Sequence, residues 1–249
     1  MKILLGLVLA FFLSSGSLAN AEDEVLTVGV EPTVQPFVIY DELKDTYDGF
    51  DVKLIRQIAQ KAGFSRVEFV KMPFDALIPA VITEQVDVAI SDISITEERS
   101  LVVNFIGPYY KSGLNAMINS RYRKEVKNIN DLGSMSVCVK EGTTCEEYAM
   151  SFPSLNLVKT QKEYELFDNL GKGVCDAVIC DDPVIKYYFV VHKGDQRYYS
   201  FKTLLSEDEF GIVTALHRPD LSERLNQAFQ SDDVQEFMKS LSKKWFGKR

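Results

Sequence analysis

The chain has 249 residues, 46% of them hydrophobic and 26% charged, and 36 acidic against 28 basic residues give a net charge of −8. This acidic balance shows no sign of nucleic-acid binding, and no segment after the N-terminal one is apolar for long enough to cross a bilayer. The length suits one large domain or two small lobes.

The N-terminal segment predicts export from the cytoplasm. Lys2 is followed by the apolar run ILLGLVLAFFL and then by small residues that end in Ala19-Asn20-Ala21. This is the order of a cleavable signal peptide, so we expect residues 1–21 to be removed and the protein to work in the periplasm. An uncleaved membrane anchor is the alternative, which the short apolar run disfavours.

The first part of the mature chain alternates between predicted strands and helices. The pattern predicts strands at 25–30 (VLTVGV), 66–72 (RVEFVKM) and 86–90 (VDVAI). It predicts helices at 49–63, where Gly63 is placed to end the helix, and at 74–85, where Pro79 disturbs the first turns.

A second series follows the segment FIGPYYKSGLN. Strands are predicted at 116–120, 135–140, 156–160 and 176–181. Helices are predicted at 145–152, 161–173 and 183–193, and the tail from residue 211 reads as a strand and two amphipathic helices. Two such series in one short chain predict an α/β fold of two lobes, each with a mainly parallel sheet flanked by helices.

Polar residues gather where the predicted strands end, which is where ligands bind in parallel α/β sheets. They are Glu31 after the first strand, Ser91, Asp92, Ser94, Thr96 and Arg99 after the third, Lys140, Gly142, Thr143 and Thr144, and finally Asp181 and Asp182. Most have an ordinary structural alternative; Thr144 with Glu147, for example, is the pattern of a capping box.

Arg99 is harder to explain structurally. Thr96 is a good N-cap and Glu97 and Glu98 suit the helix dipole, but Arg99 puts a cation at the next position, where the dipole disfavours it. A guanidinium matches a carboxylate through two parallel hydrogen bonds, and Asp181 could accept an ammonium group. Together these residues predict a site for an α-amino acid.

The chain also resembles a known family, the periplasmic polar amino-acid-binding proteins (solute-binding protein family 3), which serve ABC importers. The matching stretches are LTVGVEPTVQPF, YDGFDVKLIRQIAQKAG, FDALIPAVITEQVDVAISDISITEER, VNFIGPYYKSG, VKEGTT, DAVICDDP and KKWFGK. The resemblance implies two lobes that close by a hinge over one free L-amino acid and deliver it to an inner-membrane permease. We expect a monomer without a cofactor or a metal ion.

The resemblance also implies the domain limits. Lobe 1 is expected at residues 22–112 and again at 211–249, and lobe 2 at 113–210. The hinge strands would lie near residues 111–114 and 209–211.

By motif position, the resemblance assigns roles to individual residues. Arg99 would bind the α-carboxylate with Ser94 and Thr144, and Asp181 and the Ser91 carbonyl would face the α-ammonium. Glu31 and Phe74 would touch the ligand side chain, with Lys140 as a neighbour. Thr143 is a further candidate for the ligand site.

The sequence departs from the family pattern at two positions. Val34 stands where an aromatic residue is frequent, and Phe37 or Phe74 would have to compensate. Asp92 stands where Gly or Ser is usual, and a buried carboxylate needs a positive partner.

The charges favour a basic ligand. Once the α-groups are matched by Arg99 and Asp181, the acids Glu31 and Asp92 remain, which suits arginine first, then lysine, ornithine or histidine. If Lys140 pairs with one acid, or Asp92 turns to solvent, a glutamine-type ligand becomes the alternative. A lyase or dehydratase on the same fold is a further alternative, although no nucleophile–base or metal motif supports an enzyme.

The four cysteines, Cys138, Cys145, Cys175 and Cys180, form no CxxC pair, and the two histidines match no zinc spacing. In an oxidising compartment one or two disulfides are expected. If 135–140 and 176–181 are neighbouring parallel strands, Cys145 and Cys180 lie near their carboxyl ends, and we consider a bridge between these two. Three complete pairings remain open.

Overall fold

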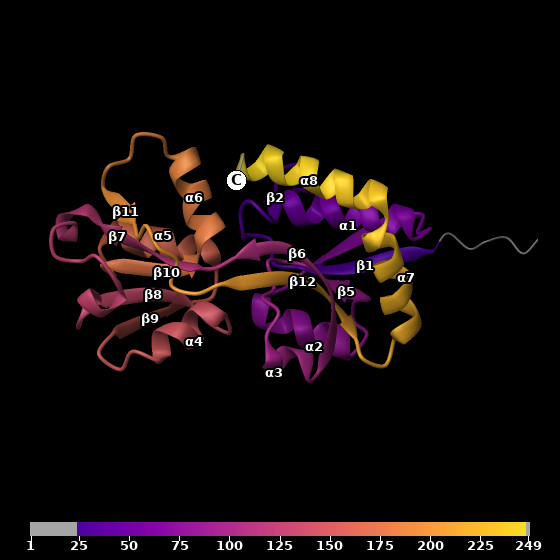
Figure 1. Cartoon of the computed structure of the whole chain (residues 1–249), viewed down its shortest axis with the longest axis horizontal. Coiled ribbons are helices and arrows are strands. Elements are labelled where there is room, and N and C mark those ends of the chain that lie inside the picture. Colours follow the sequence, from indigo (N-terminus) through magenta and orange to yellow (C-terminus); the bar gives the residue numbers. More distant parts are fainter. Residues whose placement is uncertain (1–23, 248–249) are drawn as a thin grey trace, which may run out of the picture.

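The structure, a computed structural model, describes residues 24–247, so the predicted signal peptide lies outside the described residues. It confirms an α/β fold of two lobes, each built on a five-stranded sheet with helices packed around it (Figure 1). Within residues 24–247, no helix combines the length and the apolar character needed to span a membrane.

The first lobe contains the sheet with the strand order β4–β1–β5–β12–β6. Its strands are β1 (Val25–Val30), β4 (Arg66–Lys71), β5 (Val88–Ala89), β6 (Val103–Ser112) and β12 (Asp208–Ala215). Its helices are α1 (Phe50–Lys61), the 3-10 turn η1 (Phe74–Ala76), α2 (Leu77–Ile82), α3 (Glu97–Ser100), α7 (Pro219–Gln230) and α8 (Asp232–Phe246). A small hairpin, which we did not predict, consists of β2 (Ile39–Asp41) and β3 (Thr46–Asp48).

The second lobe contains the sheet with the strand order β11–β7–β10–β8–β9. Its strands are β7 (Leu114–Asn119), β8 (Ser136–Lys140), β9 (Asn156–Thr160), β10 (Ala177–Asp181) and β11 (Tyr198–Ser200). Its helices are α4 (Thr144–Met150), α5 (Glu163–Lys172) and α6 (Asp182–Val191), with 3-10 turns η2 (Ser120–Tyr122) and η3 (Ile129–Leu132).

Both sheets mix parallel and antiparallel pairings. In the first, β1 is parallel to β4 and to β5, while β12 is antiparallel to β5 and to β6. In the second, β8 is parallel to β9 and to β10, while β7 is antiparallel to β10 and to β11. The antiparallel pairings arise at the strands that carry the chain between the lobes, so the parallel strands and their ligand-binding ends stay as predicted.

Two crossing segments connect the lobes and lie against each other. Gly113 separates β6 from β7, and the next residue, Leu114, donates its N–H to the Ser206 Oγ at 3.1 Å. A Cβ at Gly113 would collide with the Ser206 carbonyl oxygen, so only glycine permits this close approach. On the return, β12 already pairs with β6 at Asp208, so the predicted boundary at residue 210 falls inside this strand.

An aromatic cluster anchors the crossing strands to the first lobe. Phe37 packs edge-on against Phe50, Tyr110 and Phe210, and Phe246 at the end of α8 lies 4.7 Å from Tyr110 between ring centroids. Aromatic pairs at such separations add to the stabilisation from burial. The cluster therefore holds the base of the crossing strands rigidly on lobe 1.

A groove of about 1150 Å³ borders the crossing strands and is lined by residues of α6 in lobe 2 and of the C-terminal end of α8. Figure 1 shows where these two helices lie. Its walls include Tyr187 on α6 and Trp245 on α8. It is larger than the cavity described next, but Arg99, Asp92 and Asp181 do not line it. The groove has charged residues of its own, such as Lys186 and Asp208, but it does not contain the residues that the sequence predicts for the ligand site.

Candidate functional site

A small cavity lies between the lobes, at the carboxyl ends of the parallel strands. Its lining comes from both lobes and consists of Phe74, Asp92, Ser94, Arg99, Lys140, Thr143, Thr144, Cys145, Glu163, Ile179, Cys180 and Asp181. Eight of these twelve positions are residues that the sequence predicted for a ligand site. Within each lobe, loops that follow parallel strands meet at one edge of the sheet, and the cavity forms where these edges of the two lobes face each other.

Arg99 spans the two lobes. The prediction that Thr96 caps α3 is confirmed, since the Thr96 Oγ1 accepts the Arg99 N–H at 3.1 Å. The guanidinium donates to the Ser94 carbonyl at 3.0 Å and, from Nη2, to the Gly142 carbonyl of lobe 2 at 3.2 Å. Burial lowers the pKa of this group, while Glu147 and Asp181 act in the opposite direction. The guanidinium remains a cation placed to receive a carboxylate.

The start of α4 differs by one residue from the prediction. Thr143, not Thr144, is the N-cap, and its Oγ1 accepts the Glu146 N–H. Thr144 is thus the first helical residue, with a backbone N–H that has no partner inside the helix. Its Oγ1 lies 3.4 Å from the Ser94 Oγ of lobe 1, so these two hydroxyls meet across the cavity.

Asp92 lines the cavity in an unusual backbone conformation, with φ at 44°. Few residues other than glycine occupy this left-handed region. The Asp51 carboxylate of α1 holds the turn by accepting the Asp92 N–H at 2.9 Å and the Tyr109 hydroxyl at 3.0 Å. Burial, and then the charge of Asp181, raises the pKa of Asp92 well above its ordinary value.

Asp181 ends β10 beside the cavity. Burial, followed by the charges of Glu163 and Asp208, raises the pKa of its carboxyl to about 8. The Cys145 thiol lies 3.8 Å from Asp181 Oδ2. The carboxyl therefore stands in a negative environment that an ammonium group would stabilise.

Lys140 forms a buried group with Glu31 and Glu163, which we call the lysine triad. The Lys140 Nζ lies 3.0 Å from Glu163 Oε2 in its own lobe and 3.4 Å from Glu31 Oε2 in lobe 1. The three side chains are at most 8% exposed. Burial disfavours the ammonium charge, but Glu163 and Glu31 outweigh it and raise the pKa of Lys140. Glu31 is held in turn by the Thr33 N–H and hydroxyl.

Two aromatic candidates have different positions. The Phe74 ring lines the cavity, with the Arg99 guanidinium carbon 5.5 Å and the Lys140 Nζ 4.9 Å from its centroid. Phe37 is fully buried in the aromatic cluster and is not part of the cavity wall, which corrects its assignment to the ligand site. Val34 is also in the core, so Phe74 is the aromatic wall of the cavity.

Ser91 and Glu31 lie behind the lining. Ser91 is fully buried, and its Oγ accepts the Glu31 N–H at 3.0 Å and donates to the Glu31 carbonyl at 3.3 Å. Neither residue is in the cavity wall itself, and Glu31 reaches the site only through Lys140.

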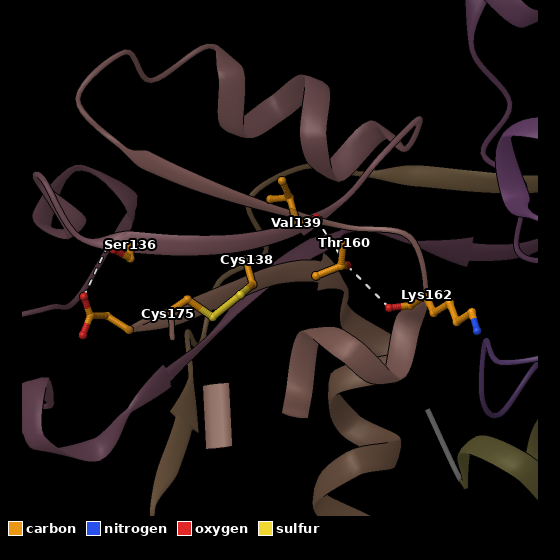
Figure 2. The surroundings of a disulfide bond; sticks show 7 residues. Ser136, Cys138, Val139, Thr160, Lys162 and Cys175 are labelled. Atoms are coloured by element: carbon orange, nitrogen blue, oxygen red, sulfur yellow. Dashed lines mark hydrogen bonds between the residues drawn. A yellow bond between two sulfur atoms is a disulfide. The ribbon is translucent and has the colours of Figure 1, made fainter. Parts of the chain in front are cut away.

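The disulfide joins Cys138 and Cys175, so the predicted bridge between Cys145 and Cys180 is wrong (Figure 2). Cys138 lies in β8, and Cys175 immediately precedes the neighbouring β10, with 5.8 Å between their Cα atoms. This spacing suits a disulfide. Cys145 and Cys180 do lie near the carboxyl ends of these strands, as expected, but they remain free, buried thiols in the cavity wall.

Sequence reasoning missed Glu163 and the role of the two thiols in the wall. Glu163 begins α5, soon after the end of β9. The rule that led to the other strand ends applies to β9 as well, so this residue could have been found.

Comparison with known proteins agrees with this geometry. Residues 26–248 match the profile of the family described as bacterial extracellular solute-binding proteins, family 3. The arginine-binding extracellular protein ArtP of Bacillus subtilis (strain 168) is 28% identical over 236 residues, which cover 94% of this chain and 90% of ArtP.

Among the solved structures that are similar to this chain are two ancestral proteins. One, an ancestral arginine-binding protein bound to arginine, has a TM-score of 0.83 at 30% identity and matches 90% of this chain and 98% of its own. Another, the ancestral amino acid-binding protein AncCDT-1, a precursor of cyclohexadienyl dehydratase, has a TM-score of 0.81 at 28% identity and matches 89% and 95%. With its two lobes, its inter-lobe cavity and a profile match over almost its full length, the chain belongs to family 3 of the bacterial extracellular solute-binding proteins.

Proposed function

We propose that the protein binds one free L-amino acid with a cationic side chain, arginine foremost, in the cavity between its lobes. The observation that carries this proposal is the balance of charge. Four acids, Glu31, Asp92, Glu163 and Asp181, face the two cations Arg99 and Lys140. An amino acid brings a carboxylate for Arg99 and an ammonium for Asp181, which cancel, so a cationic side chain is the addition that reduces the remaining negative charge.

The biological role follows from the family. A receptor of this kind captures its ligand by hinge closure and delivers it to the permease of an ABC importer. In the proposal the mature protein is a periplasmic monomer, released by cleavage of the signal peptide, and it has no role with nucleic acid.

Glutamine is the second candidate, because one observation favours it. Lys140 pairs with Glu31, which is the arrangement under which an amide side chain becomes acceptable. Glu163 argues against glutamine, because it adds a second acid that Lys140 must also neutralise. We therefore place the basic amino acids first.

Binding without turnover distinguishes the proposal from an enzyme on the same fold. The similarity to AncCDT-1 makes this alternative worth testing. Incubation of each bound ligand with the protein, followed by mass spectrometry, should recover the ligand unchanged; a product that accumulates with time would favour catalysis.

Isothermal calorimetry on mature protein, unfolded and refolded to remove any carried ligand, tests the proposal. The ligands are L-arginine, L-lysine, L-ornithine, L-histidine, L-glutamine and L-glutamate. We expect tight binding of a basic amino acid, a loss of at least about 100-fold in Arg99→Ala because a buried carboxylate would lose its partner, and no change in the exposed control Arg66→Ala. If the protein prefers glutamine, glutamine becomes the proposed ligand. If it binds none of the six amino acids, the proposal is refuted.

A further inference from the structure

The lysine triad places a cation of the protein itself where the ligand is expected to bring one. The Lys140 ammonium lies between two carboxylates and near the face of Phe74. Carboxylates and an aromatic face are the groups that recognise an ammonium or guanidinium in a binding site. Lys140 therefore already satisfies the side-chain end of the cavity.

The position of Phe74 relates this cation to the proposed ligand. Its ring lies within 5.5 Å of the Arg99 guanidinium carbon and within 4.9 Å of the Lys140 Nζ. A ligand whose carboxylate binds Arg99 would have this ring beside its side chain. The Lys140 ammonium lies near the same ring.

The triad also joins the lobes. Lys140 ends β8 and Glu163 begins α5, both in lobe 2, whereas Glu31 follows β1 in lobe 1. Opening of the lobes would separate Lys140 from Glu31 and leave the latter without its cation. The 3.4 Å pair thus favours the closed arrangement.

There is space beside the triad for a displaced side chain. Glu163 also borders a neighbouring cavity of about 350 Å³, which reaches Gln35 of lobe 1 and Phe167 and His192 of lobe 2. Rotation of the Lys140 side chain away from Glu31 would make the carboxylate available to another cation.

We propose that Lys140 is a tethered competitor: it occupies the subsite for the ligand's side-chain cation, joins the lobes through Glu31, and sets the affinity for basic amino acids. This inference rests on the proposed function and makes Lys140 its specificity-determining residue. A basic ligand must displace the ammonium, so the wild-type protein binds it more weakly than the cavity allows.

Two variants distinguish competition by the Lys140 ammonium from an effect of the net charge of the site. Lys140→Met removes the cation and makes the site more negative. The double variant Lys140→Met/Glu163→Gln removes one charge of each sign, so the net charge of the site equals that of the wild type while the tethered cation is gone. Lys172→Met on the exposed face of α5, where Lys172 pairs with Asp168, is the matched control.

Calorimetry with L-arginine and L-lysine on stripped protein gives the main result. We expect the charge-matched double variant to bind at least about tenfold more tightly than the wild type, with Lys140→Met at least as tight and Lys172→Met unchanged. A double variant within about threefold of the wild type, or weaker, overturns the proposal. Because the double variant leaves no additional unpaired charge, it decides the matter even where the single variant folds poorly.

Small-angle scattering tests the link between the lobes without relying on ligand identity. Stripped double variant should have a larger radius of gyration than stripped wild type, and equal values would overturn this part. If neither the wild type nor any variant binds a basic amino acid, the proposed function fails. The scattering result would still test whether the Lys140–Glu31 pair holds the lobes together.

Discussion

Asp92 of lobe 1 and Asp181 of lobe 2 line the cavity from its two sides, and both carboxyls have a raised pKa. Burial and the charge of Glu163 raise the pKa of Asp181 to about 8, and burial and the charge of Asp181 raise the pKa of Asp92. Glu163, Asp208 and Asp51 add negative charge around them, which Lys140 opposes. A cation bound here favours the ionised carboxylates, so binding must expel protons.

We therefore predict that the affinity for a basic amino acid rises with pH between about 5.5 and 8, by up to about tenfold per unit for each proton released. At a fixed pH near 6.5, calorimetry in buffers of different ionisation enthalpy should show proton release to the buffer. Asp181→Asn should bind more weakly and release fewer protons. Equal heats in all buffers would contradict this reading of the two carboxyls.

For single residues, the charged side chains of the site could be predicted from the sequence, whereas the choice among their pairings could not. Arg99 was conspicuous because a cation at its helix position conflicts with the helix dipole. A pairing of Lys140 with one of the acids was considered as an alternative, but the choice of Glu31 and the part of Glu163 were not predicted, because Lys140 meets Glu31 only across the two lobes. Phe37 and Phe74 are equally apolar in the sequence, and only packing distinguishes a core ring from a cavity wall.

Among the elements, β8 and β10 combine structural and functional roles. The disulfide joins Cys138 in the middle of β8 to Cys175 just before β10, and the carboxyl ends of the two strands carry Lys140 and Asp181. Figure 2 shows the bridge together with Thr160, whose hydroxyl donates to the carbonyl of Val139 in β8. The bridge thus stabilises the sheet at a distance from the ligand cavity.

Removal of this bridge should lower stability and leave binding intact. Cys138→Ala/Cys175→Ala opens a loop with a separation of 37 residues, and a loop of this size predicts a loss of about 2–4 kcal/mol in the free energy of unfolding. Denaturant titration measures the loss, and reduction of the wild type should reproduce it. Unreduced, denatured wild-type protein should titrate two free thiols, Cys145 and Cys180; a count of none would contradict the pairing.

Most helices and strands could be predicted from apolar periodicity. The errors concern features that this periodicity does not reveal. The helices at 49–63 and in the C-terminal tail were found because their apolar faces pack on the sheet. The hairpin of β2 and β3 was missed because its residues alternate weakly and lie near the surface. The cysteine pairing depends on strand register, which sequence alone leaves open.

For the whole molecule, the two repeated series of strands and helices were enough to predict two lobes. They did not predict the residue at which the chain returns to lobe 1. β12 joins the first sheet from Asp208, opposite Ser112, so we place the crossing segments at 112–114 and 204–208. The lobes contact each other through the cavity, where Arg99 reaches Gly142 and Lys140 reaches Glu31. Ligand recognition and lobe closure therefore depend on the same few side chains.

The groove between α6 and α8 contains an intrinsic fluorescent probe of lobe closure. Trp245 is the single tryptophan of the chain and stands in a wall shared by the two lobes. Movement of α6 relative to α8 must change the polarity around the indole. We expect arginine to shift its emission with the affinity found by calorimetry, and the shift to vanish in Arg99→Ala. If the emission stays constant while calorimetry shows binding, the groove keeps its shape. If the emission shifts, the rate of lobe closure can be measured in a stopped-flow fluorimeter without any attached dye.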